Sequence, residues 1–231
     1  MTTTTTTPSQ WDALDPKWEH PSNILVVGPS KCGKTQFVRK MIRHRDWLFS
    51  RPIKQVVFCY GVWQPAYDDM KREFGATDVT WMQGLPEEPY DLFAKTPGLL
   101  VVDDLMGEIE QSHKRVASWF TKGTHHMDVT LVVLMQNLFP KNMRTSSLNA
   151  HRIVLFPNPR DQSQFRRLAA QAFPGHPDWV PKALRYVQQT PFRPLILDFN
   201  QTTPNKHRLR VDPFPEDLAR SGQPFAQVLP P

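Results

Sequence analysis

The stretch of sequence that decides the fold reads Gly28-Pro29-Ser30-Lys31-Cys32-Gly33-Lys34-Thr35. It follows the apolar run Ile24–Val27 and precedes an amphipathic segment, Thr35–Arg45, so the predicted order is strand, loop, helix. Glycine, four residues and then Gly-Lys-Thr form the Walker A pattern, whose backbone N–H groups curl around phosphates. The lysine reaches the β- and γ-oxygens and the threonine hydroxyl binds Mg²⁺. The stretch therefore predicts a loop that binds ATP and Mg²⁺.

A second apolar run, Leu99–Val102, ends in the carboxylates Asp103 and Asp104. Ligands of open α/β sheets bind at the carboxyl ends of the strands, so we expect this pair beside the phosphate loop. Asp103 is the predicted Mg²⁺ ligand, directly or through water, and Asp104 is predicted to orient and polarise the attacking water. Without a phosphate loop elsewhere in the chain, acidic residues at a strand end are more often solvent-exposed side chains with no catalytic role. Pairing with Walker A here favours a Walker B motif.

A third apolar run, Leu131–Met135, ends in the amides Gln136 and Asn137. We predict that Gln136 hydrogen-bonds the γ-phosphate or the attacking water and so senses its loss. Arg144 lies in a basic loop after this strand and is the predicted arginine finger, donated to a neighbouring subunit. A surface or nucleic-acid-binding arginine is an equal alternative there, and Arg160 is the reserve candidate.

Strands and helices alternate along the chain, which predicts an α/β fold with a mostly parallel central sheet flanked by helices. Further strands are predicted at Gln55–Tyr60, Val79–Met82, Leu99–Asp103, Val129–Met135 and His151–Phe156. Helices are predicted near Tyr67–Phe74, Gln111–Lys122, Asp161–Phe173 and Trp179–Gln189, with short late strands at Pro194–Phe199 and His207–Val211. The late elements predict a short C-terminal α+β extension.

The length of 231 residues allows one sizeable core. We expect a flexible N-terminal arm over 1–20, a P-loop ATPase domain over 21–203 and a basic, proline-rich extension over 204–231. No apolar run approaches membrane-spanning length and no secretory signal is evident, so we expect no membrane partner. The two cysteines, Cys32 and Cys59, are expected to be free thiols in a reducing compartment.

The basic charge is concentrated in the C-terminal part. Residues 139–231 hold 13 Lys/Arg against 6 Asp/Glu, within a formal net charge of +6 for the chain. Such an excess fits a polyanionic partner such as nucleic acid, and a solubility surface is an equal alternative. Arg166, Arg167 and the run Lys206–Arg210 are candidates for contact with a phosphate backbone. The pair His125-His126 has no companion at ligand spacing, which favours a surface turn over a metal site.

Several stretches together resemble the genome-packaging ATPases of the HerA–FtsK branch of P-loop NTPases, of the kind encoded by poxvirus-type DNA viruses and Polinton transposons. The resemblance covers about Asn23 to Thr203. It rests on Gly28–Thr35, Val101–Met106, Gln136–Phe139, Met143–His151, Val154–Phe156, Asn158–Asp161 and Phe199–Thr203.

The resemblance implies a RecA/FtsK-like fold and a motor that threads double-stranded DNA into a preformed capsid, with DNA-stimulated hydrolysis of ATP to ADP and phosphate. It implies a homo-oligomeric ring, pentameric or hexameric, with ATP sites at subunit boundaries, a capsid or portal-vertex partner, and an intracellular location in an infected host cell. By this likeness Lys34 and Thr35 bind the nucleotide and Mg²⁺, Gln136 is the sensor and Arg144 the finger. The second acidic residue of the pair is Asp104, whereas many relatives have glutamate at this position. The aspartate side chain is shorter, which bears on its assignment as the general base.

The Walker motifs are also compatible with proteins other than a motor, which use the bound nucleotide differently. The main alternative is an ATP-gated DNA-binding or assembly scaffold without significant turnover. The sequence contains no clear arginine-rich lid, which a small-molecule kinase normally needs. It also lacks the Asn-Lys-x-Asp signature by which a GTPase recognises guanine. DNA-stimulated turnover separates a motor from a scaffold, because only a motor couples substrate engagement to hydrolysis.

Overall fold

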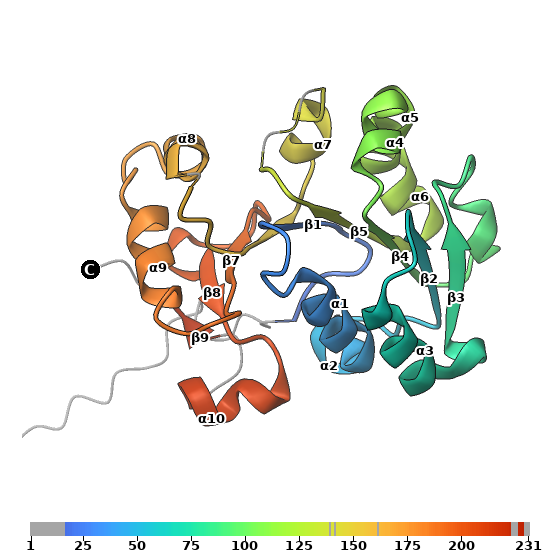
Figure 1. The fold of residues 1–231 in the computed structure, drawn as a ribbon. Coiled ribbons are helices and arrows are strands. Elements are labelled where there is room, and N and C mark those ends of the chain that lie inside the picture. The colour runs from blue at the N-terminus through green and yellow to red at the C-terminus, as the bar shows by residue number, and fades with distance from the viewer. Residues whose placement is uncertain (1–16, 139, 141, 161, 223–225, 229–231) are drawn as a thin grey trace, which may run out of the picture.

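A computed structural model describes residues 17–138, 140, 142–160, 162–222 and 226–228. Across these residues the strands form one nine-stranded sheet in the order β3-β2-β4-β5-β1-β6-β7-β8-β9 (Figure 1). The strands are β1 (Asn23–Val27), β2 (Gln55–Tyr60), β3 (Val79–Gln83), β4 (Gly98–Asp103), β5 (Val129–Met135), β6 (Arg152–Leu155), β7 (Leu195–Asp198), β8 (Leu209–Val211) and β9 (Ala226–Gln227).

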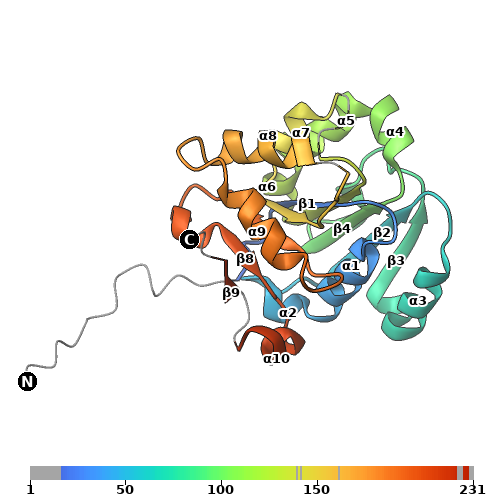
Figure 2. The same cartoon turned by 60° about the vertical axis from the view of Figure 1, so that its left-hand side comes forward.

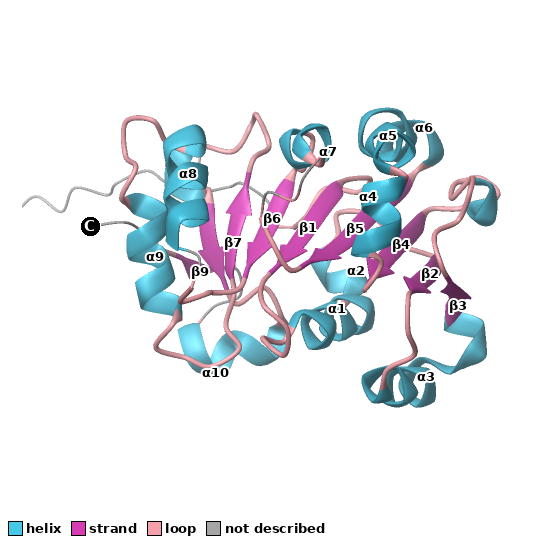
Figure 3. Cartoon of the chain, turned by 45° about the horizontal axis from the view of Figure 1, so that its top comes forward, coloured by secondary structure: helices cyan, strands magenta, loops and turns pink. Residues whose placement is uncertain are grey.

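Helices cover both faces of this sheet (Figure 3). One face carries α1 (Lys34–Arg43), α2 (Arg45–Leu48), α3 (Pro65–Asp78) and α10 (Leu218–Ser221). The other carries α4 (Met106–Gln111), α5 (His113–Ser118), α6 (Thr124–Met127), α7 (Arg144–Leu148), α8 (Gln162–Ala172) and α9 (Trp179–Val187). Figure 2 looks more directly onto the end of the sheet where α9 lies over β8. Single turns lie at Asp91–Phe93, Trp119–Gly123, Asn205–His207 and Pro215–Asp217.

The sheet has a parallel part and an antiparallel part. Strands β3, β2, β4, β5, β1 and β6 are parallel to their neighbours, whereas β6, β7, β8 and β9 pair antiparallel. Only ten residues separate β7 from β8, fewer than a parallel crossover needs, so this pair is antiparallel. The prediction of a mostly parallel, helix-flanked α/β sheet is confirmed.

The central strands are apolar on both faces because helices cover both. In β1, Ile24 and Val26 pack with Phe37 of α1, while Leu25 and Val27 belong to the apolar layer beneath α4, α5, α8 and α9. Every residue of β1, β4 and β5 is buried. This explains why these strands read as continuous apolar runs rather than alternating ones.

Most predicted elements are present, with corrections at helix ends. The strands Gln55–Tyr60 and Val129–Met135 have the predicted bounds. The helix predicted to reach Arg45 ends at Arg43, because His44 leaves the helical conformation and α2 begins after it. The helix predicted over Gln111–Lys122 is divided, since α4 ends at Gln111 and α5 passes into a π-helical turn at Trp119.

Both ends of the described chain pack against the sheet. Trp18, within the predicted arm, is buried, donates its backbone N–H to the Leu48 carbonyl at 2.7 Å and has its ring 5.5 Å from the Arg152 guanidinium. The part of the arm over 1–16 lies outside the described residues. In the predicted extension over 204–231, β8 and β9 continue the main sheet. None of the described helices is both long and apolar enough to span a membrane.

Candidate nucleotide-binding site

The phosphate loop joins β1 to α1, and its two flanking glycines are required by space and conformation. A Cβ on Gly28 would lie 2.6 Å from the Phe156 Cβ and 2.7 Å from the Cys32 Sγ. Gly33 precedes α1 with a φ of 106°, in the left-handed region that favours glycine. The Gly28 N–H also donates to the Met135 carbonyl at 3.1 Å, which fixes the start of the loop against β5.

Lys34 is the first residue of α1 and its ammonium lies inside the loop. Its Nζ donates to the carbonyls of Gly28 at 2.6 Å and Pro29 at 2.9 Å. The ten-residue helix adds the partial positive charge of its N-terminus at the same place. Ammonium, helix dipole and loop N–H groups together favour an anion such as a phosphate.

The end of β4 lies beside the start of α1 and brings two oxygen ligands together. The Thr35 hydroxyl donates to Asp103 Oδ2 at 3.0 Å. Asp103 is 6% exposed, and burial raises the pKa of its carboxyl above the ordinary value, against the hydrogen bonds from Thr35 and Tyr67. A buried carboxylate and a hydroxyl are hard oxygen donors, and next to a phosphate site they fit Mg²⁺.

Tyr67 of α3 supports Asp103 and was missed by the sequence analysis. Its hydroxyl donates to Asp103 Oδ2 at 3.0 Å, and the side chain is fully buried. Burial, and then the charge of Asp103, raise the pKa of the Tyr67 phenol. In the sequence Tyr67 is an aromatic near the start of a predicted helix, which is the pattern of an ordinary core residue. Only the packing of α3 against the end of β4 reveals its hydrogen bond.

Asp104 turns away from the strand and lines a cavity. Its φ of 58° is left-handed, and its exposed carboxylate accepts a hydrogen bond from Gln64 Nε2 at 3.4 Å. The loop after β2 passes close to it, because a Cβ on Gly61 would lie 2.3 Å from the Asp104 carbonyl oxygen. Gln64 was also missed, since nothing in the sequence pairs it with Asp104. The water-orienting role of Asp104 stays a prediction.

Gln136 and the two arginines occupy different places. Strand β5 lies between β1 and β4, so the exposed Gln136 at its end lies between the phosphate loop and the acidic pair and lines the cavity. Arg144 begins α7 and Arg160 lies after β6; both are exposed, and neither is among the described residues that line the cavity. The finger role of Arg144, donated by a neighbouring subunit, therefore stays a prediction.

The cavity has a volume of about 760 Å³ and two walls. The phosphate wall comprises Ser30, Lys31, Gly33, Lys34, Thr35, Asp103, Asp104 and Gln136. The C-terminal wall comprises Pro191, Phe192, Pro194, Asp212, Pro213, Phe214, Asp217 and Arg220. Side chains of α1 extend between them. The sequence analysis predicted the phosphate wall and none of the C-terminal wall.

Part of the basic excess is used inside the protein. Arg208 Nη1 donates to the Asp198 carbonyl at 2.9 Å, and the buried Arg210 donates through Nε to the His207 carbonyl at 2.8 Å. These two residues of the predicted phosphate-tracking run are therefore structural. Arg166 and Arg167 on α8 are exposed. Cys32 and Cys59 are free thiols, as predicted.

Fold and site define the class: the chain has an α/β fold of the P-loop NTPase type. It is similar to the cytoplasmic domain of the type VII secretion ATPase EccC of Thermomonospora curvata, with 12% identity and a TM-score of 0.52 over 78% of this chain. It spans 24% of that chain. At this identity the likeness is one of fold.

Two further solved structures are similar at lower scores. The genome packaging NTPase B204 of Sulfolobus turreted icosahedral virus 2, in complex with ATP-gammaS, has 14% identity and a TM-score of 0.46, covering 86% of this chain and 98% of that chain. The cytoplasmic domain of EssC has 18% identity and a TM-score of 0.43, covering 62% of this chain and 32% of that chain. No protein-family model and no curated protein matches the sequence.

Proposed function

We propose that this chain is an ATPase that drives double-stranded DNA into a preformed viral capsid. The observation that carries the ATPase part is the 3.0 Å contact between the Thr35 hydroxyl and the Asp103 carboxylate, beside the Lys34 ammonium. This arrangement suits a Mg²⁺-bound triphosphate, and the cavity of about 760 Å³ is large enough for a nucleotide.

In the proposed reaction each residue acts on charge or on the attacking water. Lys34 leaves the loop carbonyls and binds the β- and γ-phosphate oxygens, while Thr35 and Asp103 hold the metal. Mg²⁺, when bound, neutralises charge that develops on the phosphates. Asp104 orients the attacking water and accepts its proton, and Gln136 hydrogen-bonds the γ-phosphate or that water. Arg144 of a neighbouring subunit adds positive charge in the transition state.

The DNA and assembly parts of the proposal rest on the sequence resemblance and on charge. The resemblance to packaging ATPases of the poxvirus and Polinton type favours a pentameric or hexameric ring, a capsid or portal-vertex partner and a location inside the infected host cell. Arg166 and Arg167 of α8 are exposed, and exposed arginines suit contact with a phosphate backbone. We infer that these two arginines contribute to DNA binding.

The first test is the ATPase rate of the purified chain with and without double-stranded DNA, beside an Asp104→Asn variant. We expect DNA to raise the rate and the variant to bind ATP without turnover, because the amide accepts no proton. Tight ATP binding with no turnover by the wild-type chain, in either condition, favours the ATP-gated scaffold or a motor that is silent until its capsid partner assembles the ring.

A second test addresses the neighbour's arginine. Arg144→Ala and Lys34→Ala are each expected to be inactive, and mixing them is expected to restore part of the activity, because some boundaries then combine a sound phosphate loop with a sound arginine. Arg160→Ala, mixed in the same way, compares the reserve candidate. No recovery in rings shown to be mixed excludes donation across the boundary by Arg144.

A further inference from the structure

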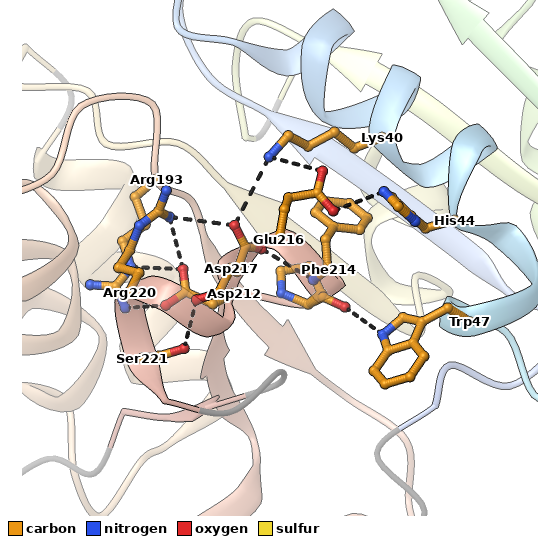
Figure 4. A network of polar contacts seen from close by, with 11 residues as sticks. Lys40, His44, Trp47, Arg193, Asp212, Phe214, Glu216, Asp217, Arg220 and Ser221 are labelled. Carbon is orange, nitrogen blue, oxygen red and sulfur yellow. Dashed lines mark hydrogen bonds and ion pairs between the residues drawn. The ribbon is translucent and has the colours of Figure 1, made fainter.

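The nucleotide cavity is held on two sides by different kinds of contact. On one side the segment after β8 is bound to α1 and α2 by ion pairs and hydrogen bonds (Figure 4). Lys40 Nζ lies 3.4 Å from Glu216 Oε1. Trp47 Nε1 donates to the Pro213 carbonyl at 3.3 Å. On the other side the chain after β5, which carries Gln136, is held by side chains of α7 and α8.

Leu138, two residues after Gln136, is the point at which both of these helices contact the chain. Its backbone N–H donates to Gln164 Oε1 of α8 at 2.9 Å, and its carbonyl accepts from the Ser147 hydroxyl of α7 at 3.4 Å. The Leu138 side chain is buried in the apolar layer beneath α8. The backbone N–H of a buried residue needs an acceptor, so the Gln164 contact fixes the position of this segment.

A second, small cavity lies between the phosphate loop and α8. It has a volume of about 10 Å³ and is lined by residues of both, among them Gly28, Gln136, Leu138, Gln164 and Phe165. A space of this size holds at most about one water molecule, so a movement of α8 is not absorbed there. Close-packed interiors transmit strain, and the opposite wall is the start of the phosphate loop together with the predicted sensor.

Helix α8 presents basic side chains to solvent while its other face is packed in the core. Phe165 is buried, whereas Arg166 and Arg167 are exposed. Arg166 lies two residues after Gln164, which is about 3 Å along the helix axis at 1.5 Å per residue. A polyanion bound to the arginines therefore acts on the same turn of helix that holds Leu138.

We propose that Gln164 is a positioning residue that couples DNA contact at α8 to Gln136 in the ATP site, through its hydrogen bond to Leu138. This inference rests on the proposed function and adds the contact by which bound DNA and bound nucleotide affect each other. Coupling between two binding sites is reciprocal, so each ligand changes the affinity of the other by the same factor.

The hydrogen bond uses the Gln164 side chain as an acceptor, and this decides the variants. Gln164→Glu retains acceptor oxygens on a side chain of the same length. Gln164→Met keeps a similar length but has only a weakly accepting thioether, so the Leu138 N–H loses its partner. Gln164→Ala also removes the acceptor and serves where the longer side chain disturbs packing. Gln171→Met, at an exposed glutamine of the same helix, is the matched control.

The test measures the affinity of the full chain for a short DNA duplex, with and without Mg-ATPγS, by fluorescence anisotropy. The analogue is hydrolysed slowly, so the comparison does not depend on turnover. For the wild type we expect the nucleotide to change the DNA dissociation constant by about 5- to 150-fold. Gln164→Met and Gln164→Ala are expected to remove most of that change, whereas Gln164→Glu and Gln171→Met are expected to retain it. Thermal melts show that each variant is folded.

The outcomes separate this inference from the proposed function. Coupling that survives in Gln164→Met and Gln164→Ala overturns the inference and leaves the proposed function standing. Coupling that is lost equally in Gln171→Met or in Gln164→Glu also overturns it, because the loss then does not follow the acceptor. A wild type that binds DNA and nucleotide independently of each other overturns it as well. A wild-type chain that fails to bind DNA or fails to bind the nucleotide overturns the inference and the proposed function together.

Discussion

The two walls of the cavity are built in different ways. The phosphate wall comes from the parallel part of the sheet, where β1, β4 and β5 each lead into predicted site residues at one edge. The C-terminal wall comes from loops around the antiparallel strands β7 and β8. The residues of the first wall therefore lie within short contiguous motifs. The residues of the second wall come from segments that are distant in sequence and meet only in the folded chain.

The two walls also depend on different kinds of contact. Glycines, a lysine and a threonine within one loop are sufficient to recognise a triphosphate, whatever nucleoside carries it. The C-terminal wall depends instead on the buried pair of Arg193 and Asp212, which come from two separate segments. Variants in the two walls are thus expected to fail in different measurements.

The largest expected effect is on the phosphate wall. Lys34→Ala is expected to lower the ATPase rate by about 10²- to 10³-fold or more, because it removes the positive charge beside the transferring phosphate. The rate is measured at saturating Mg-ATP, with a thermal melt to show that the fold is intact. Lys54→Ala, an exposed lysine before β2, is the control. Comparable rates for the two variants contradict the assignment of the loop.

The next effect concerns the stability of the C-terminal wall. Asp212→Asn leaves Arg193 buried without its charged partner, which is expected to lower the free energy of unfolding by about 3–5 kcal/mol. Urea unfolding followed by fluorescence measures the change. Asp69→Asn removes an exposed pair with Arg72 and is expected to cost less than about 1 kcal/mol. Equal losses in the two variants argue that the buried pair is not what fixes this wall.

A smaller effect is expected where α3 supports the acidic pair. Tyr67→Phe removes one hydrogen bond to Asp103, and loss of a residue that orients a metal ligand typically costs about 10- to 100-fold in metal affinity. The concentration of Mg²⁺ that gives half-maximal ATPase activity is expected to rise by about that factor. Tyr60→Phe, on the neighbouring strand end, is the control. If the variant changes stability but leaves the Mg²⁺ dependence of the ATPase rate unchanged, Tyr67 contributes to core packing and not to the metal site.

The smallest effect is a pH dependence in the parallel part. Burial lowers the pKa of His20 below its ordinary value of 6.5, although the charge of Asp128 opposes this and that of Arg51 adds to it. Below pH 6.5 the unfolded chain takes up a proton that the folded chain does not. His20 therefore contributes full stability above that pH, and stability falls as the pH drops towards the lowered value.

The slope from this one group is at most about 1.4 kcal/mol per pH unit. Urea unfolding from mildly acidic to mildly alkaline pH measures it, with His20→Gln as the comparison, because glutamine does not titrate and retains a polar contact with Thr130. A slope that is the same in both proteins assigns the pH dependence to other groups.

Much of the fold was predictable because its signals are local. Apolar runs gave β2 and β5 their observed bounds, and the Walker A glycines are needed where a Cβ would collide or φ is positive. The ends of α1 and of the α4–α5 pair could not be predicted from the sequence. A break at His44 or a π-helical turn at Trp119 depends on packing more than on residue preference.

The sequence by itself determined a phosphate loop, an acidic pair and a glutamine at the ends of predicted strands, because each follows an apolar run in the chain. Tertiary structure alone decided that Tyr67 and Gln64 contact the acidic pair, and that Phe192 and Asp217 line the C-terminal wall of the cavity. The physical reason is distance along the chain. A short contiguous motif carries its own geometry, whereas contacts between segments far apart in sequence are fixed only when strand order and packing bring them together.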